Sequence, residues 1–116
     1  MLIYKIFRPA EWDALSAAGT TLGAPVDLAD GFIHFSTAET VRETAKRHFA
    51  QEGDLVLAAV DTEGMEADLK WEASRGGALF PHLYRELRAQ EVLWTAPLPR
   101  EGDVHVFPDT VGGDAS

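Results

Sequence analysis

Apolar and polar positions along this chain follow patterns that switch between the periods of strands and helices. Residues 2–7 are rich in aromatic and β-branched side chains, which is typical of a strand. Residues 9–18 follow as a helix, with a proline in its first turn and a glycine directly after its end. Residues 20–30 contain glycine, proline and aspartate, and this composition predicts a loop.

The middle of the chain predicts a strand, a helix and a buried strand. Residues 31–36 alternate as a strand, and Ser36 with Glu39 three positions later has the pattern of a capping box at a helix start. An apolar stripe at helical spacing follows, formed by Val41, Ala45, His48 and Phe49. Residues 55–60 are apolar at every position, which favours a central strand buried on both faces.

The last part of the chain predicts several short strands. Residues 69–73 alternate, with Trp71 among the inward positions. Pro81 argues against a regular central strand in its own segment, because proline cannot donate a hydrogen bond to a ladder. Residues 91–98 and 103–107 predict two closing strands.

The size and the order of these elements indicate one domain of the α+β class. A chain of 116 residues can bury one hydrophobic core, and only one clear strand–helix–strand unit occurs, over residues 31–60. We therefore expect a single small domain over residues 1–108, with a mixed sheet and two to three helices. Residues 109–116 contain aspartate and glycine but no basic residue, and we expect a flexible acidic tail.

The charge and composition argue against several classes of protein. Nineteen acidic and ten basic residues give a formal net charge of −9, which disfavours nucleic-acid binding. No apolar run reaches the roughly 18 residues of a membrane span, and the N-terminus lacks the features of a secretory signal. The chain contains no cysteine. We expect a cytoplasmic protein that is a monomer or a homodimer and has no membrane partner.

The four histidines do not predict a metal site. Their positions, at His34, His48, His82 and His105, show none of the short spacings typical of metal ligands. His48 lies on the apolar stripe of its helix, so we expect it in the core or at its boundary. His105 lies between two valines, which predicts a surface position on a strand.

The stretch from Leu69 to Tyr84 carries the strongest indication of function. Around a glycine pair it gathers Lys70, Trp71, Glu72, Ser74, Arg75, His82 and Tyr84. Glycine lets a backbone approach a ligand closely, and functional loops concentrate polar side chains in this way. We therefore expect a binding site for a small polar ligand here.

Several of these side chains also have a plain structural role to weigh. Arg75 offers a planar fork for a phosphate or a carboxylate, or it stays solvated on a turn. Trp71 and Tyr84 can stack on a ring, although the core is the expected place for Trp71. Glu72 can accept hydrogen bonds from sugar hydroxyls or act as a base. It can also pair with Arg75 in a buried network that includes His82 and only staples the loops.

A second candidate region lies just before the predicted helix start. His34 and Ser36 point to the same side of their strand, and free N–H groups at the helix start around Thr37 attract anions. The alternative is that Ser36 only caps the helix and His34 forms a hydrogen bond within the core. Both interpretations stay open at this point.

Four segments taken together resemble one known family. They are IYKI at 3–6, DGFIHFSTAETV at 30–41, DLVLAAVD at 54–61 and LKWEASRGGALFPHLY at 69–84. Over residues 2–95 the chain is similar to the domain of unknown function family 952. That family is similar in structure to the ADP-ribosyltransferases, which implies a split sheet that binds NAD in a cleft. A fainter similarity to the RNA 2′-phosphotransferases implies that His34 and Ser36 line this cleft.

Two hypotheses of function follow. In the first, the chain is a small ADP-ribosyltransferase-like enzyme for NAD or another phosphorylated nucleotide, with His34 and Glu72 as catalytic residues. Its ligand-binding residues are then Ser36, Thr37, Trp71, Ser74, Arg75, His82 and Tyr84. In the second, the same cleft belongs to a non-catalytic module that binds a small anion or a protein partner.

Overall fold

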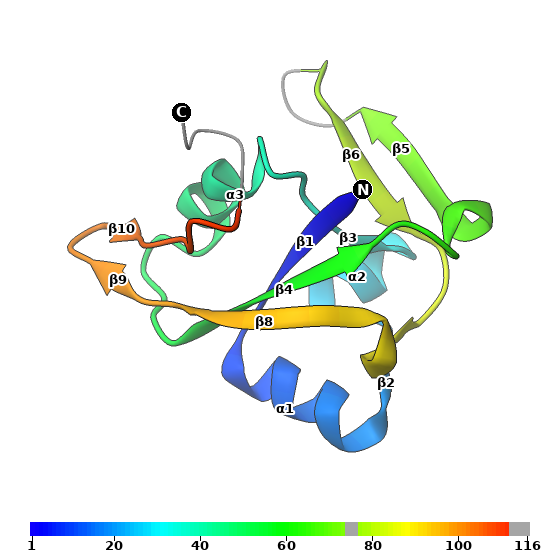
Figure 1. Ribbon diagram of the computed structural model, residues 1–116, viewed down its shortest axis with the longest axis horizontal. Helices are drawn as coiled ribbons and strands as arrows, with labels where there is room; N and C mark the ends of the chain where they lie inside the picture. The colour runs from blue at the N-terminus through cyan, green and yellow to red at the C-terminus, as the bar shows by residue number, and fades with distance from the viewer. Residues whose placement is uncertain (74–76, 112–116) are drawn as a thin grey trace.

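The computed structural model describes residues 1–73 and 77–111, and an antiparallel sheet of three strands forms its centre (Figure 1). The strands of this central sheet are, in spatial order, β1 (Leu2–Phe7), β4 (Leu55–Asp61) and β8 (Val92–Leu98). The predicted central strand over residues 55–60 is confirmed, because β4 is the middle strand and is buried over most of its length.

A second antiparallel sheet of three strands is joined to the first at one point. Its strands are, in spatial order, β3 (Ile33–His34), β6 (Leu79–Leu83) and β5 (Leu69–Ala73). Tyr4 of β1 and Ser36 form the junction, where each backbone N–H donates to the other residue's carbonyl at 2.8 Å. All strand pairs of the described residues are antiparallel, so the predicted mixed sheet is wrong. The chain leaves β3 after two residues to meet β1, which places β3 and β4 in different sheets.

Two short ladders and two 3-10 turns complete the described strands and turns. They are β2 (Thr20–Thr21) with β7 (Leu87–Arg88), β9 (Arg100–Glu101) with β10 (Val104–His105), η1 (Glu66–Asp68) and η3 (Ala89–Glu91). The predicted closing strand over residues 91–98 is confirmed as β8. The predicted strand over residues 103–107 is shorter than expected, because only β10 pairs with β9.

The first helix, α1 (Pro9–Ala18), has the predicted bounds. Its proline occupies the first position, where no intrahelical N–H bond is needed, and the Glu11 carboxylate accepts a hydrogen bond from the Arg8 N–H at 2.9 Å. Gly19 ends the helix with a φ of +83°, a left-handed conformation that favours glycine. No helix in the described part of the chain is long and apolar enough to cross a membrane.

Residues 20–30 do not form the predicted loop, because β2 and a second helix, α2 (Pro25–Asp30), lie within them. A proline again occupies the first helical position, and the Asp27 carboxylate accepts a hydrogen bond from the Ala24 N–H at 2.8 Å. Gly31 ends the helix in a left-handed conformation. The proline and glycine that suggested a loop are therefore the start and stop signals of a short helix.

The third helix, α3 (Val41–His48), starts five residues after the predicted N-cap Ser36, so the predicted capping box is wrong. The backbone of Ser36 is taken up by the bridge to β1, and its hydroxyl lies 2.8 Å from the Thr44 hydroxyl. Thr40 directly precedes the helix, and its hydroxyl accepts a hydrogen bond from the Thr37 N–H at 2.9 Å.

Pro81 lies within β6, the middle strand of the second sheet, contrary to the prediction. Its carbonyl accepts a hydrogen bond from the Phe35 N–H at 3.0 Å, and the nitrogen of a strand residue faces the same neighbour as its carbonyl. Strand β3 has already ended at His34. The N–H that proline lacks would therefore face only the chain that follows β3, where the regular ladder has stopped. Proline is tolerated here because, at Pro81, β6 no longer has a regular strand neighbour on the β3 side and is locally an edge strand.

Two clusters of buried side chains form the core, one on each face of the central sheet. The first cluster includes Ile3, Phe7, Leu15, Ile33 and Leu83, and the second includes Tyr4, Val41, Leu57, Leu98 and Val111. Val111 is fully buried, and its carbonyl accepts a hydrogen bond from Arg42 at 3.3 Å. Packed residues therefore extend past residue 108, where the sequence predicts the end of the domain.

Two histidines lie elsewhere than the sequence predicts. His48 is exposed, because the buried side of α3 is formed by Val41 and Ala45 and the helix ends at this histidine. His105 is buried rather than on the surface, since β10 packs against α3. Its Nε2 lies 2.7 Å from the carbonyl oxygen of Glu52.

Candidate functional site

A cavity of about 490 Å³ opens where the two three-stranded sheets meet. Strands β1 and β6, helices α2 and α3 and the chain around β3 all contribute to it. The described lining comprises Tyr4, Phe35, Phe49 and Phe80 (aromatic), Lys5, Arg8, His34, His48 and His82 (basic), Asp27, Ser36 and Thr44 (acidic or hydroxyl), and Ile6, Ala24 and Val26 (aliphatic). The fold therefore brings chemically active side chains from distant parts of the sequence into one hollow.

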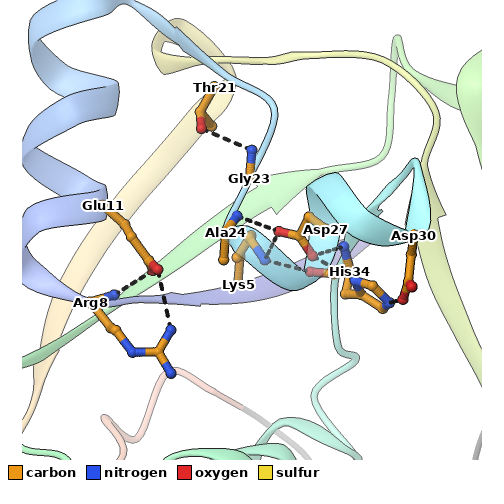
Figure 2. Close-up of polar contacts among 9 residues, drawn as sticks. All are labelled: Lys5, Arg8, Glu11, Thr21, Gly23, Ala24, Asp27, Asp30 and His34. Atoms are coloured by element: carbon orange, nitrogen blue, oxygen red, sulfur yellow. Dashed lines mark hydrogen bonds and ion pairs between the residues drawn. The ribbon is translucent and has the colours of Figure 1, made fainter.

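Asp27 is the buried centre of a polar network beside this cavity (Figure 2). Its Oδ2 accepts hydrogen bonds from Lys5 Nζ at 2.9 Å and from the Ala24 N–H at 2.8 Å. Its Oδ1 accepts a hydrogen bond from the His34 N–H at 3.1 Å and lies 2.5 Å from His34 Nδ1. Burial alone would raise the pKa of Asp27, but the hydrogen bond to His34 and the charge of Lys5 outweigh it and lower the pKa to about 2.

His34 is held between two carboxylates (Figure 2). Its Nδ1 faces Asp27, and its Nε2 lies 3.0 Å from Asp30 Oδ2. A carboxylate only accepts hydrogen bonds, so both contacts are satisfied together only when both ring nitrogens carry hydrogen. Within residues 1–73 and 77–111, no group of three or more histidine, aspartate or glutamate side chains has a metal-binding arrangement.

Two basic residues of the lining, Lys5 and Arg8, were not predicted from the sequence. Lys5 is buried, and its Nζ donates to the His34 carbonyl at 3.0 Å in addition to Asp27. Arg8 binds Glu52 through Nε at 2.7 Å and Nη2 at 2.9 Å, and its guanidinium lies 4.8 Å from the centre of the Phe49 ring. The sequence pattern that could have indicated Lys5 is its position inside the apolar strand LIYKIF, because a buried lysine needs a partner for its charge.

His82 lies opposite His34 in the ladder between β3 and β6. Its Nδ1 is 2.7 Å from Oε1 of Glu72, and the Tyr84 hydroxyl donates to the same oxygen at 2.7 Å. The hydrogen bond to His82, followed by that from Tyr84, lowers the pKa of Glu72, and the bond to Glu72 raises the pKa of Tyr84. His82 is only 6% exposed, so Glu72 holds a nearly buried ring at the wall of the cavity.

Phe32 connects these groups and is not among the residues predicted from the sequence. Its ring stacks on His82 with centroids 4.2 Å apart and an interplanar angle of 24°. It also contacts His34 at 4.7 Å and Tyr84 at 5.1 Å, and the two histidine rings lie 5.2 Å apart. The sequence pattern that could have indicated Phe32 is the alternation of residues 31–36, because Phe32 lies two positions before His34 and shares its strand face.

Of the two binding residues predicted near the helix start, one lines the cavity and the other does not. Ser36 lines the cavity, but its hydroxyl is engaged with Thr44. Thr37 is not among the described lining residues, and its N–H already donates to Thr40. The Thr37 N–H, one of the groups around the predicted helix start, is therefore occupied within the protein.

The predicted site residues between Leu69 and Tyr84 also differ in where the structure places them. Trp71 is 38% exposed and lies on the face of β5 opposite Glu72, so its predicted inward position is wrong. Tyr84 binds Glu72 outside the described lining of the cavity. Ser74 and Arg75 lie outside the described residues, and so does the predicted pairing of Arg75 with Glu72.

The fold and the cavity define a class of protein, a small α+β domain with several antiparallel sheets and a polar hollow at the junction of two of them. Residues 6–95 match the family described as protein of unknown function (DUF952). The chain belongs to this family, as its sequence motifs predict.

Solved structures of one bacterial protein are similar to this chain. The crystal structure of protein CC0527 from Caulobacter crescentus is 53% identical, with a TM-score of 0.91 over 96% of this chain and 98% of that chain. The solution NMR structure of CC0527 is 55% identical, with a TM-score of 0.80 over 90% of each chain. No curated protein matches the chain. The similarity to CC0527 extends over nearly the whole of both chains, so the two share the same fold.

Proposed function

We propose that the cavity at the sheet junction binds a small phosphorylated ligand with a flat ring, with NAD or another nucleotide as the first candidates. The observation that supports this most is the charge of the lining. In a chain with a net charge of −9, the described lining contains the cations Lys5 and Arg8 against a single carboxylate, Asp27, and it adds three histidine rings that can donate hydrogen bonds. Local positive charge of this kind favours an anionic ligand.

The size and the remaining lining agree with this ligand class. A volume of about 490 Å³ lies within the range of roughly 300–1,000 Å³ typical of small-molecule sites. Phe35, Phe49 and Phe80 offer apolar surface for a base or a nicotinamide ring. Arg8 and Lys5 are already held in ion pairs, so a phosphate would share them with Glu52 and Asp27. The resemblance to the ADP-ribosyltransferases makes NAD the first ligand to test.

Binding is tested by isothermal titration with NAD, ADP-ribose and AMP up to millimolar concentrations. We expect Arg8→Ala to weaken binding by about tenfold, because a charge-assisted contact to the phosphate is lost. Arg88→Ala is the matched control, since Arg88 is an exposed arginine of β7 outside the described lining. Thermal melts of both variants report any loss of stability. The absence of heat with every ligand would remove the proposal.

A second candidate, a non-catalytic binding module, has an observation of its own. Both ring nitrogens of His34 face carboxylates, and Glu72 is not among the described lining residues. Neither predicted catalytic residue therefore presents an obvious proton-transfer atom to the cavity. Incubation with NAD and measurement of nicotinamide release separates the two candidates, because binding without release favours the module and release favours the transferase-type enzyme.

A further inference from the structure

We infer that His82 is the residue of this cavity that exchanges a proton with the ligand, that Glu72 positions it, and that the ligand offers it a hydroxyl group. The inference rests on the proposed function, since it assigns roles within the same cavity. It reassigns the predicted roles of His34 and Glu72.

The two histidines differ in what their nitrogens contact. His34 has a carboxylate at Nδ1 and another at Nε2. Asp27 holds Nδ1 in a buried network that also includes Lys5, so release of that hydrogen would leave a carboxylate facing a lone pair. Both ring nitrogens of His34 therefore already face carboxylates of the protein, and neither is placed to take a proton from a ligand.

His82 has the arrangement of a proton acceptor. Its Nδ1 faces Glu72, a carboxylate that accepts, so the hydrogen of the neutral ring belongs on Nδ1 and the lone pair on Nε2. Glu72 lies outside the described lining while His82 lies within it, and the Nε2 edge of the ring turns away from Glu72. The carboxylate both orients the ring and stabilises the imidazolium that forms when Nε2 takes a proton.

The surroundings of His82 restrict it to one position. Phe32 stacks on its ring, and His34 lies edge-on at 5.2 Å. Lys70 stands opposite His82 on β5, and the Tyr84 hydroxyl shares the carboxylate of Glu72. Among residues 1–73 and 77–111, the charged and titratable groups that these contacts place around the ring are His34, Lys70, Glu72 and Tyr84.

The proton transfer itself is simple. The O–H bond of a ligand hydroxyl, such as a ribose hydroxyl of a nucleotide, breaks as an N–H bond forms at Nε2 of His82. The electron pair stays on the ligand oxygen, and the hydrogen on Nδ1 stays bonded to His82 and is donated to Glu72. A hydroxyl whose hydrogen is shared in this way is a stronger nucleophile.

Titration of ADP-ribose in buffers of different ionisation enthalpy tests the assignment. In the wild-type chain the apparent binding heat should depend on the buffer, because a ligand hydroxyl can donate only to the lone pair of Nε2, so binding releases to the buffer any proton that Nε2 carries in the free chain. His82→Gln should abolish this dependence and change the affinity by less than about threefold. His34→Gln should retain the dependence. Persistence of the dependence in His82→Gln, its loss in His34→Gln, or its absence from the wild type would overturn the inference.

Nitrogen NMR of the ligand-free chain, labelled with ¹⁵N-histidine, tests the role of Glu72 independently of any ligand. The neutral ring of His82 should carry its hydrogen on Nδ1, and Glu72→Gln should shift the population toward the other tautomer. Glu86→Gln, at an exposed glutamate, is the matched control and should change nothing. The opposite tautomer in the wild type overturns the inference alone. The expected tautomer together with no binding heat removes the proposed function, and the proton-acceptor role with it.

Discussion

Asp27 shows how one buried residue can organise a site. Its two oxygens are contacted by four nitrogen atoms, from Lys5, Ala24 and His34, so its charge and its accepting capacity are both satisfied. A buried carboxylate without such partners would be neutral instead. The same contacts fix the ring of His34 beside the cavity, so stability and site geometry depend on one side chain.

The lowered pKa of Asp27 makes a prediction about acid stability. A carboxyl group whose pKa falls on folding contributes stability above its unfolded pKa, and this contribution is lost as the pH falls through its folded pKa. With a folded pKa of about 2 and an ordinary value of 3.8, Asp27 contributes about 2 kcal/mol at neutral pH, lost mainly between pH 4 and pH 2.

Urea unfolding of the wild type and Asp27→Asn from pH 6 downward measures this contribution. The wild type should be the more stable chain at pH 6, and the difference should shrink as the pH falls below 4. Asp30→Asn is the control, because Asp30 is a half-exposed carboxylate that also contacts His34. A difference that stays constant with pH, or an equal effect of Asp30→Asn, would contradict the account.

At the scale of elements, the short helix α2 matters more for the site than its length suggests. Asp27 and Asp30 lie three residues apart and therefore share one face of the helix. That face is turned toward His34, which each of them contacts. The position of α2 depends on the turn at Gly23, where the chain approaches Asp27 closely.

Gly23→Ala tests this close approach. Gly23 has a φ of +101°, and an added Cβ would lie 2.1 Å from Asp27 Oδ2 and 2.6 Å from Asp27 Cβ. Gly19→Ala is the matched control, because Gly19 has a φ of +83° with nothing within 4 Å of the added Cβ. We expect Gly23→Ala to lower the free energy of unfolding by about 2 kcal/mol more than Gly19→Ala, measured by urea unfolding. Equal losses would show that the contact with Asp27 is unimportant.

The elements that could be predicted are those whose signals are local. Residues 9–18 carry their own start and stop residues, and the apolar run of β4 needs no partner to be recognised. The failures have long-range causes. Ser36 lies in a sequence typical of an N-cap, but its backbone forms hydrogen bonds with Tyr4 of β1. Pro81 is tolerated in β6 only because β3 ends beside it.

At the scale of the whole molecule, the junction of the two sheets creates the site. The Tyr4–Ser36 bridge fixes the end of β3 against β1, and the His34–His82 pair fixes β6 against β3. Alternation along one strand predicts that His34 and Ser36 share a face, and the resemblance implies that they line a cleft. Lys5 could not be predicted as their neighbour, because its contacts depend on chain segments that are distant in sequence.

The most direct test of the central claim is to map ligand contacts on the ¹⁵N-labelled chain by amide NMR while ADP-ribose or NAD is added. The account predicts shifts that are concentrated around the sheet junction, at Lys5, Ser36, Thr44 and His82, and that saturate with the ligand. Shifts concentrated at the smaller groove of about 210 Å³ beside Leu28 and Arg85, or no shifts at millimolar ligand, would contradict it.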